Sequence, residues 1–113
     1  MKVELNGFGE KMVTFEAAQG IAAGMPVMMS ANGKVAPCAA GKLFCGIAGN
    51  VRGEFAAVQL SGYVKVPYSG TVPVVGYQSF SGDGTGKVKV DSAGRPLLVV
   101  DVDTATAVCG IIL

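Results

Sequence analysis

The sequence predicts an all-β fold, and three observations lead to this prediction. The 113 residues include 17 glycines and 5 prolines, and valine is abundant. Glycine and proline interrupt helices, and the best helical window, residues 14–23, contains Gly20 and is followed by Gly24. Residues 51–70 alternate between apolar and polar side chains with the period of two that is typical of a half-buried strand. We therefore expect a compact rolled sheet or small barrel with at most one short helical turn.

The length and composition predict one domain. A chain of 113 residues can bury one hydrophobic core but is too short for two. Because 50% of the residues are apolar and only 15% are charged, we expect other subunits to cover part of the apolar surface. Residues 1–113 are expected to form a single β domain, with residues 1–15 as an N-terminal arm or edge strand and residues 20–113 as the β core.

The charge and hydropathy patterns exclude several kinds of partner. The net charge is +1 and the nine Lys and Arg residues are scattered, whereas nucleic-acid binding needs a clustered basic surface. No apolar run approaches the roughly 20 residues that span a bilayer. The N-terminus lacks the uninterrupted apolar stretch of a signal peptide. We therefore expect neither a nucleic-acid nor a membrane partner. We also expect that the protein is made and kept in a cytosol.

The alternating stretch at residues 51–70 is the expected centre of the fold. A straight strand of about 14 residues would span roughly 45 Å, longer than strands of small domains usually are. Ser61 and Gly62 are therefore predicted to form a bend or bulge, so that one strand serves two parts of a rolled sheet. Side chains at odd positions, including Gln59, Tyr63 and Lys65, are expected to face water or a partner. The even positions expected to face the core are Ala56, Val58, Leu60, Gly62, Val64, Val66 and Tyr68.

The N-terminal third is expected to contain an arm and a hairpin. Residues 11–15 are predicted to form a short strand and residues 16–24 a loop or single turn. Residues 25–36 read as a hairpin, because Asn32-Gly33 is the preferred pair for a two-residue type I′ turn. Pro26 and Pro37 limit it at both ends. The turn predicts two cross-strand pairs, Ala31 with Lys34 and Ser30 with Val35.

The remaining strands are expected between glycine-rich turns. Residues 52–54 and 91–94 are predicted turns, and residues 81–86 a mobile turn. An apolar C-terminus would be costly in water, so its strand is expected to pair inside the sheet. The predicted strand regions are residues 43–51, 72–80, 87–90, 97–102 and 108–113.

One internal similarity suggests a repeat. Gly-Lys-Val at residues 33–35 and Ala-Gly-Lys at residues 40–42 match residues 86–88 and 93–95 at a constant offset. Cys-Gly-Ile at residue 45 recurs at residue 109 with a larger offset, which implies an insertion in the second copy. Glycine-rich turns also recur by chance, so both interpretations stay open. A true repeat would place two similar β units on either side of the long strand.

The sequence offers little for catalysis. There is no histidine, which removes the commonest general base and most transition-metal sites. Asp101 and Asp103 would share one face of a strand, but they lack further ligands and are best interpreted as solvent-facing. Residues 82–86 resemble a phosphate-binding loop, yet they lead into a strand rather than a helix and are predicted to form a hairpin loop. We predict no enzyme, no cofactor, and no catalytic, cofactor-binding or metal residues.

The three cysteines are predicted to be small buried hydrophobes in a reducing compartment. Cys38, Cys45 and Cys109 are odd in number and have no C-x-x-C spacing, which argues against both a disulfide framework and a zinc site. Cys45 and Cys109 have no neighbouring base or basic cluster that would make a thiol reactive.

A pattern of short motifs runs through residues 20–113. Gly-Met-Pro-Val at residue 24 is followed by Phe-Cys-Gly-Ile-Ala at residue 44 and Val-Gln-Leu-Ser-Gly at residue 58. A Gly-Lys-Val hairpin and a closing Gly-Ile-Ile-Leu complete it. In content and order this pattern resembles the small capsid decoration, or cement, proteins of tailed bacteriophages. It includes no invariant catalytic signature.

The resemblance implies a compact β-clip or β-tulip fold, often trimeric. Such proteins bind the major capsid protein on the outside of the expanded head shell and brace the shell against internal DNA pressure. The implied partners are the major capsid protein and other copies of the chain, with a trimer favoured. The implied location is the capsid exterior of the virion, after assembly in the host cytoplasm. By analogy of position alone, residues 1–15 would become ordered on the capsid surface.

Two other functions stay open on the sequence. One is another phage structural module, such as a head fibre base or a tail-associated module. The other is a small glycan- or ligand-binding β domain in which Phe55, Tyr63 and Tyr68 serve as stacking platforms.

Overall fold

Ten strands and no helix make up the part of the chain that the structure, a computed structural model, describes: residue 5 and residues 7–113. The all-β class predicted from the glycine, proline and valine content is confirmed. The strands are β1 (Lys11–Ala17), β2 (Pro26–Ala31), β3 (Lys34–Pro37), β4 (Gly46–Arg52), β5 (Phe55–Ser61), β6 (Tyr63–Ser69), β7 (Gly76–Gly82), β8 (Val88–Val90), β9 (Arg95–Asp103) and β10 (Val108–Ile112).

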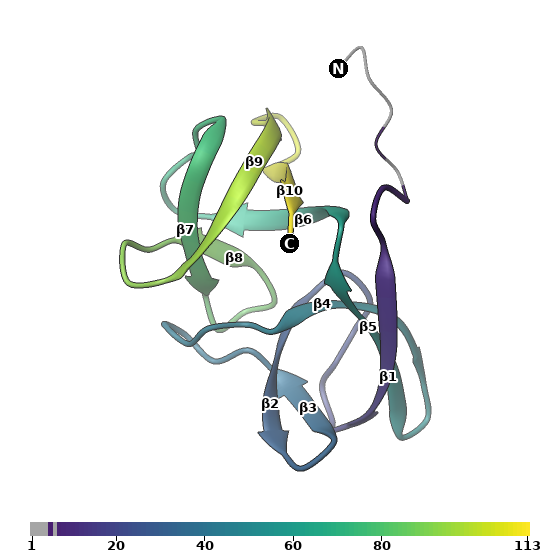
Figure 1. The fold of residues 1–113 in the computed structure, drawn as a ribbon. Helices are drawn as coiled ribbons and strands as arrows, with labels where there is room; N and C mark the ends of the chain where they lie inside the picture. Colours follow the sequence, from purple (N-terminus) through teal and green to yellow (C-terminus); the bar gives the residue numbers. More distant parts are fainter. Residues whose placement is uncertain (1–4, 6) are drawn as a thin grey trace.

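These strands form two closed barrels, one from β1–β5 and one from β6–β10 (Figure 1). The order around the first barrel is β1-β3-β2-β4-β5, and around the second it is β6-β8-β7-β9-β10. In each barrel the first strand pairs in parallel with the third, and the other pairs are antiparallel. The small barrel expected from the sequence is thus present twice with one topology, as an internal repeat predicts.

The sequence similarity that suggested the repeat is correct in one part and wrong in another. The two Gly-Lys-Val copies lie at equivalent places, where β3 and β8 begin. The two Cys-Gly-Ile copies do not, because the first lies at the start of β4 whereas the second lies in β10, the counterpart of β5. Each copy needs its glycine for a separate close contact: a Cβ on Gly46 would overlap the Gln59 carbonyl oxygen, and one on Gly110 would overlap the Asp101 carboxylate.

Gly62 separates β5 from β6 and joins the two barrels. The predicted bend is confirmed, since β5 belongs to the first barrel and β6 to the second (Figure 1). Gly62 has a φ of 89°, which side-chain-bearing residues rarely adopt. A Cβ at this position would also overlap the Phe8 carbonyl oxygen and lie 2.6 Å from the Glu10 nitrogen. Only glycine therefore meets both the backbone conformation and the close approach of residues 8–10.

Hydrogen bonds from both chain ends hold this bend. The Tyr63 N–H donates to the Phe8 carbonyl at 2.9 Å, and the Leu113 N–H donates to the Gly62 carbonyl at 3.0 Å. The Ser61 hydroxyl donates to the Gly9 carbonyl at 3.0 Å. The arm predicted over residues 1–15 lies partly outside the described residues; within them, residues 7–9 form a turn against the junction.

The alternating pattern of β5 and β6 is right at most positions and wrong at Gln59 and Tyr63. Gln59 and Tyr63, expected to face water or a partner, are 7% and 3% exposed. The Gln59 amide donates to the Ser61 and Tyr63 carbonyls at 3.0 and 2.9 Å, and the Tyr63 hydroxyl donates to the Asp101 carboxylate at 3.1 Å. Both faces of the chain are covered at the junction, so these polar side chains are buried with partners. Lys65 is exposed as predicted, and the even positions that are buried as predicted are Ala56, Val58, Gly62, Val66 and Tyr68.

The hairpin of β2 and β3 lies where predicted but has another turn. Ala31 pairs with Lys34 as expected, whereas Val35 pairs with Met29 instead of Ser30 because the register shifts between Met29 and Ala31. Gly33 has a positive φ of 66°, but Asn32 does not, so the turn is not type I′. The bulge in β2 accommodates the different twist of this turn.

Two predicted strands begin later in the chain than expected. Residues 43–45 and 72–75 are loops, since β4 begins at Gly46 and β7 at Gly76. The apolar side chains in both segments are either buried in the core without strand pairing or exposed to solvent. In contrast, β7 extends to Gly82, into the predicted turn. The C-terminal strand β10 pairs between β6 and β9, as predicted for an apolar terminus.

Two clusters of buried side chains replace the single expected core, and the second is built by both halves of the chain. Val27, Val35 and Val58 lie in the first cluster. The second includes Phe80 and Ile111 together with residues from the first half, and these are Cys38, Phe44 and Ile47. The first half of the chain therefore contributes side chains to the buried cluster around the second barrel.

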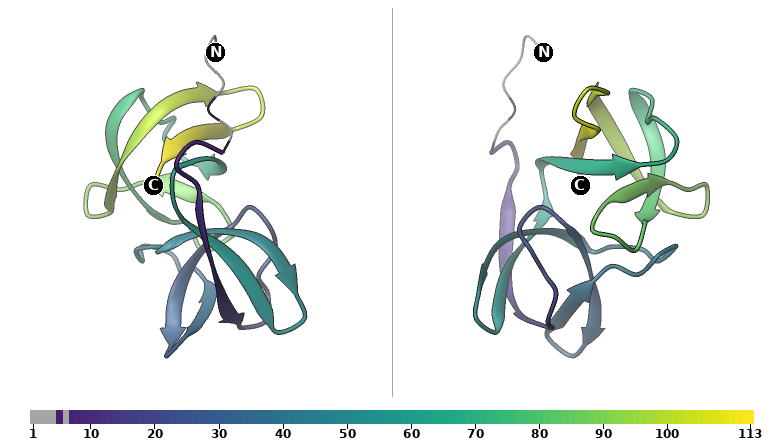
Figure 2. Two further views of the ribbon diagram at one scale, coloured as in Figure 1. Left: turned by 45° about the vertical axis from the view of Figure 1, so that its right-hand side comes forward. Right: turned by 180° about the vertical axis from the view of Figure 1, so that it is seen from behind.

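The segment between β3 and β4, residues 38–45, is fixed against the second barrel. Gly41 N–H donates to the Gly82 carbonyl at 2.9 Å, and Gly82 N–H donates to the Lys42 carbonyl at 3.0 Å. The Arg95 guanidinium donates to the Cys45 carbonyl at 3.2 Å and lies 5.9 Å from the centre of the Phe44 ring. Because of these contacts the barrels are packed side by side, as the turned views show (Figure 2).

The role of Gly62 can be measured by comparing Gly62→Ala with Gly24→Ala. Gly24 has nearly the same φ, 90°, but an added Cβ there meets nothing within 4 Å. Both variants lose stability through backbone strain, about 1–3 kcal/mol. Gly62→Ala should lose about 1–3 kcal/mol more, because its methyl group displaces residues 8–10. Urea unfolding measures both values, and equal losses would show that residues 8–10 do not constrain the junction.

Candidate interaction surfaces

One candidate surface is formed by the end of the connection between β6 and β7 together with the first two residues of β7, and we call it the apolar loop (residues 72–77). Val74, Val75 and Tyr77 are 67%, 63% and 83% exposed, and Val72 is half-exposed. The loop lies at the end of the second barrel, beside the start of β7 (Figure 1). Large apolar side chains gathered in solvent usually mark an interaction site.

The backbone of the apolar loop is held in place. Pro73 is buried between exposed neighbours, and the Val74 N–H donates to the Gln78 side-chain oxygen at 2.7 Å. Residues 70–78 contain no charged side chain. The loop thus presents its apolar side chains from an ordered backbone, which lowers the entropy lost when a partner binds.

A second candidate surface is the edge of β1. This strand pairs with β5 along most of its length, but it pairs with β3 only at Glu16 and Ala17. Within the described residues, the β1 edge formed by residues 11–15 has no strand beside it. Met12 and Val13 on this stretch are 42% and 41% exposed. An open edge with apolar side chains is a template for another strand.

A shallow groove lies on the outer face of β1, β5 and β4, on the side of β1 that pairs with β5. It has a volume of about 140 Å³. The Phe55 ring is 56% exposed and forms an aromatic wall of the groove. The other lining residues are Thr14, Asn50, Arg52 and Ala57. An aromatic ring, a guanidinium, an amide and a hydroxyl are thus brought together from three strands.

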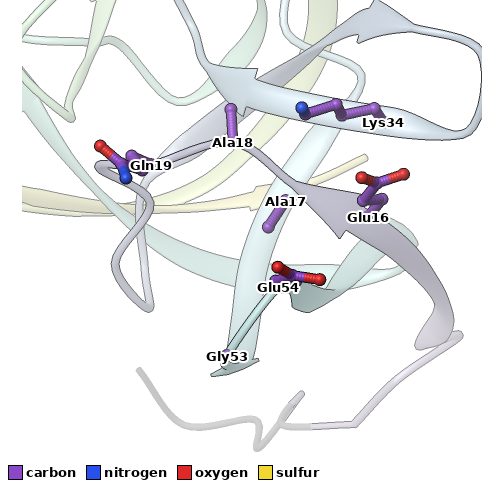
Figure 3. A pocket seen from close by; sticks show the side chains of 7 residues that line it. All are labelled: Glu16, Ala17, Ala18, Gln19, Lys34, Gly53 and Glu54. Atoms are coloured by element: carbon purple, nitrogen blue, oxygen red, sulfur yellow. The ribbon is translucent and has the colours of Figure 1, made fainter.

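A polar cleft of about 310 Å³ opens where β1 meets β3 and the turn between β4 and β5. Its charged side chains are those of Glu16, Lys34 and Glu54, and Figure 3 shows that these groups spread over the cleft without converging. Sites for acid–base chemistry normally desolvate their carboxylates, whereas Glu16 and Glu54 are both exposed. Among the described residues, no group of three His, Cys, Asp or Glu side chains is placed to hold a metal ion.

Asp101 and Asp103 are brought together, as predicted, in a cleft of about 370 Å³ that Lys65 also lines. The Asp101 carboxylate accepts the hydrogen bond from Tyr63. The Asp103 carboxylate accepts hydrogen bonds from the N–H groups of Thr106 and Ala105, and bonds from these two residues hold its pKa below the usual value. Both carboxylates therefore serve the fold of β9 and its turn.

The loop after β7 that resembles a phosphate-binding loop is occupied by its own carboxylate. Asp83 accepts hydrogen bonds from the N–H groups of Thr85 and Lys87 at 2.7 and 3.0 Å. It also accepts bonds from the hydroxyls of Ser69 and Thr85, each at 2.7 Å. Two of the N–H groups that a bound phosphate would need are thus already taken. The segment is a hairpin loop, as expected, and leads into β8.

The cysteines have the properties of buried hydrophobes. Cys38 and Cys109 are buried, Cys45 is half-buried, and none forms a disulfide. Burial raises the pKa of all three thiols, that of Cys109 to about 11. The reactive thiolate is therefore scarce at neutral pH.

The stacking platforms suggested by the sequence are wrong at two of three positions. Tyr63 and Tyr68 are 3% and 5% exposed, so their rings cannot stack on a ligand, whereas Phe55 is accessible. Sequence reasoning missed Tyr77, the most exposed large apolar side chain in the described residues. The signal was a nine-residue uncharged segment with a central proline, which favours an exposed loop over a strand.

Comparison with models of known protein families finds no match to this chain, and a search of curated proteins finds no similar sequence. In the described residues no helix has the length and apolar character needed to cross a membrane.

Asp83 should make stability depend on pH below about 4. Partial burial opposes its ionisation, but the hydrogen bonds from Ser69, Thr85 and Lys87 outweigh burial and lower its pKa from 3.8 to about 2. Because the folded-state pKa is depressed, this stabilisation is present above the unfolded value and is lost as the pH falls from about 4 to about 2.

Asp83→Asn should therefore lower the free energy of unfolding at pH 7 by about 1–2 kcal/mol, less than a fully buried charged hydrogen bond because the group is largely solvated. It should also flatten the loss of stability between pH 4 and pH 2. Glu54→Gln, on an exposed turn, is the control for removing one negative charge. Urea unfolding across this pH range measures both effects, and an unchanged acid profile in Asp83→Asn would contradict the assignment.

Proposed function

We propose that this protein is a non-enzymatic capsid decoration protein, which binds the major capsid protein on the outside of a bacteriophage head and stabilises the shell. The observation that carries the proposal is the open edge of β1, residues 11–15, with Met12 and Val13 exposed beside it. Support also comes from the order of short motifs in residues 20–113, which resembles that of decoration proteins.

The proposed contact is strand addition. Main-chain groups along residues 11–15 exchange hydrogen bonds with an extended segment of the capsid protein, and Met12 and Val13 become buried against it. Residues 7–9 end one residue before β1 begins, so these residues lie next to the same contact. Each contact is modest, but a symmetric shell repeats it many times, and copies of the protein that associate with one another bind more than one shell subunit.

Capsids that lack the protein provide the test. Purified protein should bind them, label their outer surface in antibody microscopy, and raise the temperature at which they break. Val13→Lys places a charge on the β1 edge and should weaken binding about tenfold or more, or about 1.4 kcal/mol, while the protein stays folded.

The matched control is Leu43→Lys, which introduces a lysine at another apolar side chain that is 56% exposed and away from the β1 edge. It should bind like the unmodified protein. Failure of the unmodified protein to bind such capsids, or capsids no more fragile without it, would refute the function. Equal binding by the two variants would refute the role of the β1 edge.

A further inference from the structure

We infer that each molecule accepts a single partner strand, at the open edge of β1, and that the main chain of Thr14 is the centre of this contact. The two barrels have equivalent edges, and only the edge of the first barrel is left free to pair. The identity of the partner as a capsid protein rests on the proposed function, whereas the chemistry of the contact follows from the arrangement of the two barrels.

The hydrogen bonds at the end of β1 show which of its residues face the open edge. The Ala17 N–H donates to the Glu54 carbonyl on the β5 side, whereas the Glu16 N–H donates to the turn before β3. Successive residues of a strand direct their main-chain groups to opposite sides, and the register with β5 is regular from Met12 to Glu16. Thr14 and Met12 therefore direct their N–H and carbonyl groups away from β5.

These outward main-chain groups are free to pair. Those of Met12 and Thr14 have no hydrogen-bond partner among the described residues, and residues 11–14 are all exposed to solvent. The free edge ends at Glu16, because the N–H of that residue already donates to the Gly33 carbonyl at 2.9 Å. A partner strand can thus lie along residues 11–15.

The second barrel contains the equivalent edge, on β6. This strand pairs with β10 along most of its length, but with β8 only at Tyr68 and Ser69. The Tyr68 N–H donates to the Ala107 carbonyl just before β10, as the Ala17 N–H does to the Glu54 carbonyl just before β5. Counted back from these two bonds, residues 12, 14 and 16 of β1 correspond to residues 63, 65 and 67 of β6.

Each of the three corresponding residues on β6 obstructs strand addition. The Tyr63 N–H donates to the Phe8 carbonyl, and the Tyr63 carbonyl accepts a bond from the Gln59 amide, both at 2.9 Å. Lys65 places an exposed charge on the edge, and Pro67 has no N–H to donate. Charged residues and prolines are devices by which proteins keep sheet edges from pairing. One topology is therefore protected in the second barrel and left open in the first.

The side chains of β1 specify what the partner strand must carry. Phe15 packs against the first buried cluster, and Val13, on the same face of the strand, is 41% exposed. The partner residue that exchanges main-chain bonds with Thr14 is flanked by two residues whose side chains lie on this face. The partner is therefore an extended segment that matches residues 11–15 in length, with an apolar residue on each side of a central residue other than proline.

The contact can be tested without capsids by amide hydrogen exchange of the full chain, followed by NMR. The probe is a synthetic peptide with blocked ends, Lys-Thr-Val-Thr-Val-Thr-Lys, which has the required pattern. At millimolar concentration it should slow exchange at Met12 and Thr14 about twofold or more, the effect of a half-occupied site, and leave Lys65 unchanged. A peptide with proline in place of the central threonine is the control and should protect none of these amides.

A variant of Thr14 tests the same contact on capsids. Thr14→Pro removes the outward N–H and keeps the pairing with β5, because an edge strand tolerates proline where its nitrogen faces solvent. It should bind both the peptide and capsids that lack the protein about tenfold or more weakly than the unmodified chain. Thr14→Ala loses the same side chain but keeps the N–H, so it is the matched control and should bind like the unmodified protein.

Urea unfolding checks that both variants are folded, and if Thr14→Pro is not, the exchange measurement on the unmodified chain decides alone. Absence of protection at Thr14, protection of Lys65 together with Thr14, or equal peptide binding by folded Thr14→Pro and Thr14→Ala would overturn the inference. Undiminished capsid binding by folded Thr14→Pro would refute this contact alone and leave the proposed function standing. Protection by the peptide without binding to capsids would refute the proposed function and leave the strand site standing.

Discussion

The close approach of residues 8–10 to Gly62 is the constraint on which the rest of the structure depends. Gly62 lets the chain leave one barrel and enter the other without a loop, and the missing side chain gives the N-terminal segment room to cross the bend. The Tyr63 N–H then donates a hydrogen bond to the Phe8 carbonyl, and the Leu113 N–H donates one to the Gly62 carbonyl. Both chain ends and the middle of the chain therefore meet at one point, and burial of Gln59 and Tyr63 follows from this convergence.

The parts of the fold that depend on local chemistry were predictable from the sequence. Glycine and proline content gave the all-β class, period-two alternation located β5 and β6, and the unusual length of that stretch indicated the bend at Gly62. The strand order within each barrel was not predictable, because it depends on pairings between strands that are distant in the sequence. The burial of Phe44 in the cluster shared with the second barrel and the bulge next to Ala31 likewise depend on contacts that no local pattern records.

Fewer features of the candidate surfaces than of the fold could be predicted from the sequence. Low charge indicated that apolar surface is covered by a partner, but not which residues expose it. Tyrosines look alike in a sequence, whereas the structure buries Tyr63 and Tyr68 and exposes Tyr77. The groove at Phe55 joins side chains from three strands, and the open edge of β1 exists only because β3 reaches no further than Glu16. Such features arise from topology.

The packing of residues 38–45 against the second barrel predicts that the two barrels unfold together. Differential scanning calorimetry of the dilute protein tests this claim directly. A single transition whose calorimetric and van't Hoff enthalpies agree is the expected result. Two separate transitions, or a calorimetric enthalpy well above the van't Hoff value, would show that the barrels are independent and would contradict the interlocked arrangement.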